Sequence, residues 1–307
     1  MKFIDMHCDT PSFLYNNDEN SLRHSMGSVD VRKLKEGDAL CQFFAFFLDL
    51  KKVNEPFSEF KNMFNNFKKE IDENKDEFNI ILSYEDINKG KIGALFTVEE
   101  GGVIEGSIKN LRRLYDLGIR AMTLTWNYEN SIGFPNSRKE FMNYGLKNFG
   151  IQVVEEMNKL GMIIDVSHLS DGGFYDVCRL SKKPVIASHS NSRAITDHPR
   201  NITDHMIKML ADKGGVMGLN FCSDFIGKGK ITKLEDMILH LKHIRKIGGI
   251  DVIALGTDFD GIDNTVEIEN TSKMPMLEEM LIKEGFSYYE TEKVFYKNAE
   301  RVLKDIL

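Results

Sequence analysis

Short apolar runs alternate with longer amphipathic segments along the whole chain, and no internal repeat or Pro/Gly-rich linker interrupts them. Eight runs have the length of strands, and several are apolar on both alternating faces, as buried parallel strands are. They span residues 3–6, 40–47, 93–98, 121–125, 162–166, 185–187, 216–219 and 252–255. Eight strands interleaved with helices predict an α/β fold, a TIM-like (β/α)8 barrel, as one domain over residues 1–307. A doubly wound open sheet is the alternative, because a strand count from one sequence can miss or invent a strand.

The segments between these runs carry helical spacing. Apolar residues recur every third position in one of them, and Gly118 follows as a helix stop: Ile108, Leu111, Leu114 and Leu117. Residues 145–160 and 234–247 predict two further helices. Ser287 and Glu290 have the spacing of a capping box ahead of the last helix. The connection over residues 51–89 is long, and its pattern predicts no definite element.

Side chains that bind metal ions follow several of the predicted strands. In a barrel of this kind the active site forms at the carboxyl ends of the strands, so these side chains would converge there. The candidate ligands are His7, Asp9, Glu100, His168 and His189. The eighth run leads into the sequence GTDFDG, which adds Asp258 and Asp260 at the same end.

The spacing of these residues indicates shared ions. His7 and Asp9 are two residues apart, so on an extended strand both side chains leave the same face. Cys8 then points the other way and is expected to be a packing residue. Imidazole and carboxylate groups suit a borderline cation such as zinc. Glu100 has two oxygens and could bridge two ions, and ions about 3.5–4 Å apart can hold a hydroxide and polarise a carbonyl together.

Each candidate also has an ordinary structural explanation. One histidine at a strand end is more often a hydrogen-bonded core or surface residue than a ligand. Ser188 and Ser190, around His189, could do no more than cap the next helix. Five histidines lie in polar helical or loop sequence, where a solvated position is expected: His24, His198, His205, His240 and His243. The five candidate ligands together, each after a strand, are much harder to explain by chance, so the sequence predicts a metal centre.

Composition and charge exclude several other classes of protein. The 307 residues carry a net charge of −7, with Lys and Arg scattered, which argues against a nucleic-acid or anionic-membrane partner. The N-terminus, MKFIDMHCDT, has charged residues where a secretory signal needs an apolar run. The four cysteines are far apart and form no CxxC pair, as expected of reduced thiols in a cytoplasmic protein.

The chain resembles the membrane (renal) dipeptidase family of zinc metallopeptidases over nearly its whole length. The motifs that carry the resemblance are IDMHCDT, VEEGG, LRRLYDLGIRAMTLT, IIDVSHLS, PVIASHSNSR, HPRNITD, GTDFDG and TSKMPMLEEML. The resemblance implies a barrel of the metal-dependent hydrolase type with two zinc ions, and a homodimer. It also implies hydrolysis of dipeptides, with tolerance of a D-residue at the C-terminal position.

The resemblance also assigns roles to individual residues. His7, Asp9 and Glu100 would hold the first zinc ion, and Glu100, His168 and His189 would hold the second. Arg200 would bind the terminal carboxylate of the substrate, a task that suits the planar guanidinium fork. Without the resemblance, a surface salt bridge would be the better interpretation of Arg200. Asp258 would be the acid/base residue; strand position alone does not separate it from Asp260.

One position departs from the family pattern. Better-known members carry a histidine after the segment MTLT, implied to contact the tetrahedral intermediate, and this chain has Trp126 there. The neighbouring Asn127 could donate a hydrogen bond to the substrate, or Trp126 could form an apolar wall that narrows the pocket. Two other functions therefore stay open. One is hydrolysis of another small amide or ester, such as an N-acyl amino acid or a lactone, and the other is a binding protein that has lost turnover.

Overall fold

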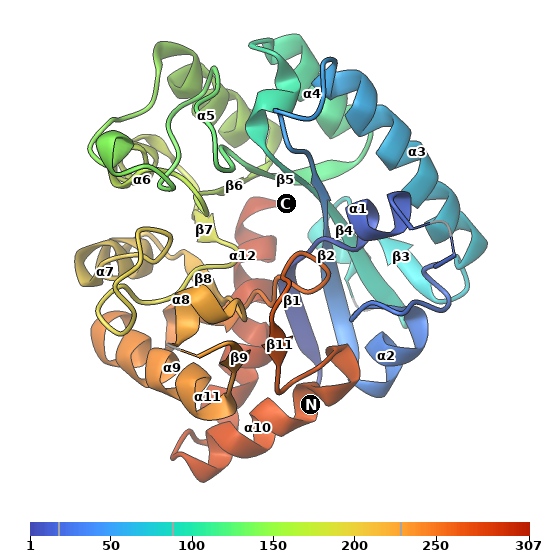
Figure 1. Cartoon of the computed structure of the whole chain (residues 1–307), viewed down its shortest axis with the longest axis vertical. Helices are drawn as coiled ribbons and strands as arrows, with labels where there is room; N and C mark the ends of the chain where they lie inside the picture. The colour runs from blue at the N-terminus through green and yellow to red at the C-terminus, as the bar shows by residue number, and fades with distance from the viewer. Residues whose placement is uncertain (18, 88, 228) are drawn as a thin grey trace.

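A closed barrel of parallel strands forms the centre of the computed structural model, which describes residues 1–17, 19–87, 89–227 and 229–307. Within these residues eight strands follow the order β2-β1-β10-β8-β7-β6-β5-β4, and pairing of β2 with β4 closes the ring (Figure 1). The strands are β1 (Phe3–Cys8), β2 (Ala39–Phe47), β4 (Ile92–Glu99), β5 (Ile119–Thr123), β6 (Ile163–Asp165), β7 (Ile186–Ala187), β8 (Val216–Leu219) and β10 (Ile253–Leu255). Each overlaps one of the predicted runs. The predicted (β/α)8 barrel is confirmed, and the open sheet is wrong.

Most of the helices surround the ring and cover its outer face, while α12 (Asn298–Ile306) lies across its centre (Figure 1). The other helices have the following bounds: α1 (Thr10–Tyr15), α2 (Val31–Glu36), α3 (Pro56–Glu73), α4 (Ile108–Asp116), α5 (Asn148–Leu160), α6 (Asp171–Leu180), α7 (Asp204–Asp212), α8 (Ser223–Ile226), α9 (Leu234–Gly248), α10 (Met274–Lys283) and α11 (Tyr288–Glu292). The predicted capping box is present, because Ser287 N donates to Glu290 and Glu290 N donates to Ser287. None of the helices in the described part of the chain has both the length and the apolar character that crossing a membrane requires.

Residues 51–89, for which the sequence predicted no definite element, contain α3 and the short strand β3 (Phe78–Ile80). The helix buries one face, with side chains spaced by three, four and seven residues: Phe60, Met63, Phe64, Phe67 and Ile71. This face packs on the outside of the barrel, where Phe46 of β2 meets Phe60 with ring centroids 5.5 Å apart. The helical pattern is therefore present in the sequence and was missed there.

The barrel interior is filled by apolar side chains, and α12 closes its amino-terminal end. Interior side chains come from all eight barrel strands, among them Ile4, Phe43, Leu95, Ala121, Ile163, Ile186, Val216 and Ala254. Val302, Leu303 and Ile306 of α12 join the same cluster, and α12 lies across the centre of the ring in Figure 1. Because α12 closes the amino-terminal end, a site inside the barrel can open to solvent at the other end, where the strands have their carboxyl ends.

Two glycines let neighbouring strands approach closely at that open end. A Cβ atom on Gly218 would lie 2.0 Å from the carbonyl oxygen of Ser188, and one on Gly256 would lie 1.8 Å from the same atom. Only glycine fits at these positions. This close approach sets the positions from which His189 and Asp258 leave β7 and β10.

Candidate metal centre

The open end of the barrel gathers a carboxylate and three imidazoles, all buried. They come from His7 of β1, Glu99 of β4, His168 after β6 and His189 after β7. The Nε2 atoms of His168 and His189 lie 3.0 and 3.3 Å from Glu99 Oε1, and 3.1 Å from each other. The other oxygen, Glu99 Oε2, lies 3.3 Å from His7 Nε2. One carboxylate thus presents a different oxygen to each side of the cluster.

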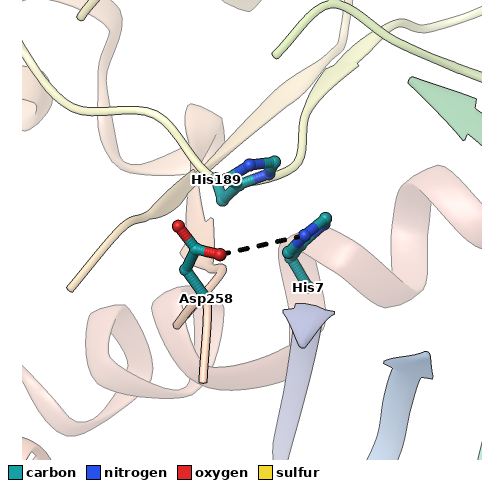
Figure 2. Close-up of side chains that lie close together, drawn as sticks. All are labelled: His7, His189 and Asp258. Carbon is teal, nitrogen blue, oxygen red and sulfur yellow. Dashed lines mark ion pairs between the residues drawn. The ribbon is translucent and has the colours of Figure 1, made fainter. Parts of the chain in front are cut away.

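Asp9 and Asp258 complete this cluster. Asp9 Oδ2 lies 3.8 Å, and Asp258 Oδ1 lies 3.9 Å, from His7 Nε2. Figure 2 shows Asp258 and His189 on two sides of His7, whose ring stacks on that of His189 with centroids 3.7 Å apart. Potential ligand atoms fall into three overlapping groups: His7, Asp9 and Glu99; Glu99, His168 and His189; and His7, His189 and Asp258.

The structure corrects the prediction for Glu100. Its carboxylate accepts hydrogen bonds from the backbone N–H of Gly102 at 2.6 Å and of Trp126 at 2.9 Å, and from Asn130 Nδ2 at 2.6 Å. Glu100 belongs to none of the three groups formed by the described residues. Burial raises its pKa to about 7. Glu100 therefore holds the loop after β5 in place, and the carboxylate shared by the histidines is that of Glu99.

Strand alternation explains why Glu99 faces the centre. Leu95 of β4 lies in the barrel interior, and Glu99, four residues later, emerges on the same face. Phe96 and Val98 pack on the outside. The strand ends at Glu99, and Glu100 has φ of +105°, which turns the chain away from the strand direction. This alternation is visible in the sequence and is the signal that distinguishes Glu99 from Glu100.

A register shift in β1 brings His7 to the mouth. Ile4 and Met6 lie in the barrel interior, so simple alternation would place His7 on the opposite face. The pairing of β1 with β2 shifts between Asp5 and Cys8, which resets the alternation. Cys8 is buried and directs its thiol toward a backbone carbonyl of β2, as expected of a packing residue.

Left-handed backbone recurs at the positions that leave the strands. His168 has φ of +66°, and Asp258 and Asp260 both have φ of +65°. Such values are uncommon outside glycine and cluster at functional sites, where the surrounding structure enforces them. At His168 and Asp258, each three residues after a strand ends, this backbone directs the side chain toward the cluster at the barrel mouth.

The cluster fits a divalent cation. Ligand atoms around a tetrahedral zinc ion with bonds of about 2.0–2.1 Å lie about 3.3–3.4 Å apart. The three separations among Glu99 Oε1, His168 Nε2 and His189 Nε2 are 3.0, 3.1 and 3.3 Å. Within the described residues, His7 Nε2 and Asp9 Oδ1 are buried without a hydrogen-bond partner. A buried polar atom without a partner is costly, and coordination to a cation would satisfy both.

The protonation states of His168 and His189 suit a cation, whereas His7 would give up a proton to bind one. Burial would raise the pKa of Glu99, but the neighbouring His7, His168 and His189 hold it well below its usual range. Burial would lower the pKa of His7, but Glu99 and Asp9 raise it well above its usual value. Burial lowers the pKa of His168 to about 4 and that of His189 well below its usual value. Both of these imidazoles are neutral at pH 7 and keep a nitrogen lone pair for a ligand.

Polar groups behind the histidines fix their orientation. His189 Nδ1 lies 2.7 Å from Ser188 Oγ, and that hydroxyl also donates to Asp165 at 2.5 Å. His168 Nδ1 faces Asn127 Oδ1 at 3.4 Å. In both histidines Nδ1 has a partner and Nε2 points into the cluster, which is the arrangement that supports metal ligands.

The structure separates Asp258 from Asp260. Asp260 Oδ2 accepts a hydrogen bond from Thr10 Oγ1 at 2.7 Å, and its Oδ1 accepts one from Ser28 N at 2.5 Å. Asp260 thereby ties the segment before α2 to the barrel. Asp258 instead faces His7, and its second oxygen accepts a hydrogen bond from Asn220 Nδ2 at 2.8 Å. Asn220, which follows β8, was missed in the sequence.

Arg200 is buried behind the centre rather than on the surface. Its Nη2 donates to the carbonyl oxygen of His189 and its Nη1 to Ser190 Oγ, both at 2.8 Å. Both acceptors are neutral, and within the described residues Nε has no hydrogen-bond partner. Burial lowers the pKa of Arg200, while Asp258 and Glu99 oppose that shift. The surface salt bridge considered for this residue is therefore wrong.

A cavity of about 830 Å³ opens above the cluster and gives access to it. Glu99, His168 and Asp258 form part of its floor. Trp126 and Asn127 line its wall, and the Trp126 ring meets Phe47 edge to face with centroids 4.7 Å apart.

Five histidines were expected in solvated positions. One of them, His240, is fully buried, so the expectation was wrong for this residue.

Comparisons with known proteins show which fold and family the chain shares with them. The fission yeast Schizosaccharomyces pombe has two relatives named uncharacterized dipeptidases. C965.12 is 32% identical over 90% of this chain and 73% of its own length. C3A11.10c is 30% identical over 98% of this chain and 80% of its own length. A metallopeptidase from Rhodobacter sphaeroides has the same fold, with a TM-score of 0.92 at 23% identity over 100% of this chain and 99% of that chain.

The sequence profile of the family described as membrane dipeptidase (peptidase family M19) matches residues 1–307, the whole chain. A full-length match of this kind covers every strand end described above. The protein is accordingly a hydrolase of the metallopeptidase class, and the chain belongs to the membrane dipeptidase family.

Proposed function

We propose that this protein hydrolyses dipeptides at a centre of two zinc ions that share Glu99. The observation that carries the proposal is the Glu99 carboxylate, which directs Oε2 toward His7 and Oε1 toward His168 and His189. His7, Asp9 and Glu99 would hold one ion, and Glu99, His168 and His189 would hold the other. Paired ions held in this way polarise a carbonyl group and lower the pKa of water.

Asp258 is the proposed proton carrier of the reaction. Hydrolysis of an amide needs a base that accepts a proton from water and an acid that donates one to the departing amine, and one carboxylate can do both in turn. Asp258 Oδ1 faces the cluster, and the side chain lies in the floor of the cavity. Burial raises the pKa of Asp258, which brings the group closer to a neutral working pH.

Arg200 is the proposed anchor for the terminal carboxylate of the substrate. It is a buried cation whose two hydrogen bonds go to neutral acceptors, so a substrate carboxylate nearby would be attracted to it. The R. sphaeroides relative is described in complex with a phosphinate mimic of the dipeptide L-Ala-D-Ala. That ligand supports the proposal that this protein accepts dipeptides with a D-residue at the C-terminal position.

Trp126 and Asn127 are proposed to contact the rest of the substrate. Trp126, packed on Phe47, offers a rigid apolar wall, and Asn127 lies between that wall and His168. If His168 Nδ1 donates to Asn127 Oδ1, the amide group of Asn127 is left to donate a hydrogen bond to the substrate. A polar donor and an apolar wall together would restrict which side chains fit.

Replacing Glu99 and Glu100 separately tests the shared ligand. In Glu99→Gln the amide has one weakly basic oxygen, so we expect bound zinc to fall from about two equivalents to below one, with loss of peptidase activity. Glu100→Gln turns an NH2 group toward one of the N–H donors around Glu100, so it should lower thermal stability but retain both equivalents. Zinc is measured by elemental analysis on protein purified without chelators. Loss of zinc from Glu100→Gln with zinc retained in Glu99→Gln would contradict the proposal.

Asp258→Asn removes the proton carrier while keeping its shape. Proton transfer of this kind contributes about 10²–10⁴-fold, so kcat for a dipeptide should fall by that factor with zinc content near normal. Asp260→Asn is the matched control and should act mainly on thermal stability, because Asp260 only joins Thr10 to Ser28. A variant Asp258→Asn with full turnover would remove Asp258 from the mechanism.

Arg200→Lys keeps the positive charge but loses the planar fork. We expect kcat/KM for free dipeptides to fall about 10–100-fold, the size of a lost charged hydrogen bond. Dipeptide amides lack the carboxylate and should be poor substrates whose kcat/KM barely changes in the variant. Equal losses for dipeptides and their amides would make Arg200 a structural residue. Testing N-acyl amino acids and lactones alongside separates the dipeptidase from a hydrolase of other small amides or esters.

A further inference from the structure

Asn220 is a buried amide that touches Asp258 directly. It follows β8, is fully buried, and donates from Nδ2 to Asp258 Oδ2 at 2.8 Å. Its own Oδ1 accepts a hydrogen bond from the backbone N–H of Cys222 at 2.6 Å. Since the oxygen must face that N–H, the NH2 group is the end that faces the carboxylate.

A second buried asparagine holds Asn220 in place. Asn191 Oδ1 accepts from Asn220 N at 3.0 Å, and Asn191 Nδ2 donates to the carbonyl oxygen of Asn220 at 2.9 Å. This reciprocal pair joins the segment after β7 to the segment after β8. The backbone and the side chain of Asn220 are thus both fixed before any substrate binds.

Asp258 depends on Asn220 for the direction of its carboxylate. The φ of +65° at Asp258 directs its side chain toward the barrel mouth. The carboxylate can still rotate about the Cβ–Cγ bond. In the described part of the chain Asn220 is the one side chain that donates a hydrogen bond to Asp258. With Oδ2 held by Asn220, Oδ1 is left to face His7 and the cluster.

We infer that Asn220 is a positioning residue of the reaction, which acts by holding one oxygen of Asp258 so that the other faces the reacting groups. The inference rests on the proposed function, because it requires Asp258 to carry the proton. Both ends of the Asn220 amide are already hydrogen-bonded, to Asp258 and to Cys222 N, so we expect it to affect turnover through Asp258 and substrate binding little.

The test compares Asn220→Leu, which keeps most of the side-chain volume, with Asn298→Leu. Asn298 is also a buried asparagine with hydrogen bonds to other segments, since its Nδ2 donates to two backbone carbonyls, but it lies at the closed end of the barrel. For a dipeptide substrate we expect Asn220→Leu to lower kcat about 10–100-fold, with KM within about threefold and zinc content unchanged. We expect Asn298→Leu to lower thermal stability with kcat within about threefold of the original enzyme.

A double-mutant cycle shows whether the effect passes through Asp258. In an Asp258→Asn background, Asn220→Leu should cause little further loss of kcat, because the group that it positions is already gone. Losses that multiply in the double variant, or equal losses of kcat in Asn220→Leu and Asn298→Leu, would overturn the inference. If Asn220→Leu does not fold, Asn220→Ala makes the same comparison with a smaller side chain.

A crystal structure of the Asn220 variant gives a readout that does not depend on activity. The Asp258 carboxylate should rotate away from His7 or adopt several orientations, and an unmoved carboxylate would overturn the inference. This readout also separates the two claims. If the original enzyme fails to cleave dipeptides, the proposed function fails, while the orientation of Asp258 still tests the role of Asn220.

Discussion

The structure of the active end depends on one constraint: a buried carboxylate lies among three imidazole groups, in an arrangement that fits a divalent cation. Glu99 Oε1 is 3.0 and 3.3 Å from two of the imidazole nitrogens, which are themselves 3.1 Å apart. Two neutral imidazole nitrogens at that distance can share at most one proton, and their lone pairs otherwise face each other. A divalent ion removes this conflict, and the separations match those around a tetrahedral zinc ion.

The local backbone geometry at the carboxyl end of each strand produces this arrangement. Alternation along β4 brings Glu99 to the interior face, a register shift in β1 does the same for His7, and left-handed backbone aims His168 and Asp258. Hydrogen bonds behind the histidines, above all the one between His189 Nδ1 and Ser188 Oγ, then fix the rings. Because the strands are parallel and α12 closes the other end, these side chains converge at a single opening.

Much of this could be predicted from the sequence, because buried strands and strand-end ligands leave strong local patterns. The eight apolar runs predicted the barrel, and four of the five candidate ligands gather at its open end. That they bind metal ions stays a prediction. The resemblance assigned the shared ligand to Glu100, whereas the two-residue alternation along β4 points to its neighbour Glu99. The contact between Asn220 and Asp258 joins residues 38 positions apart, so no local pattern reveals it. The expected homodimer and cytoplasmic location stay predictions.

The central claim, that Glu99 is shared by two metal ions, is tested most directly by anomalous diffraction. Crystals of the zinc-loaded protein would be measured on both sides of the zinc absorption edge. The account predicts two anomalous peaks, one within bonding distance of Glu99 Oε2 and His7, the other within bonding distance of Glu99 Oε1, His168 and His189. A single peak, or a peak bonded to Glu100 instead of Glu99, would contradict it.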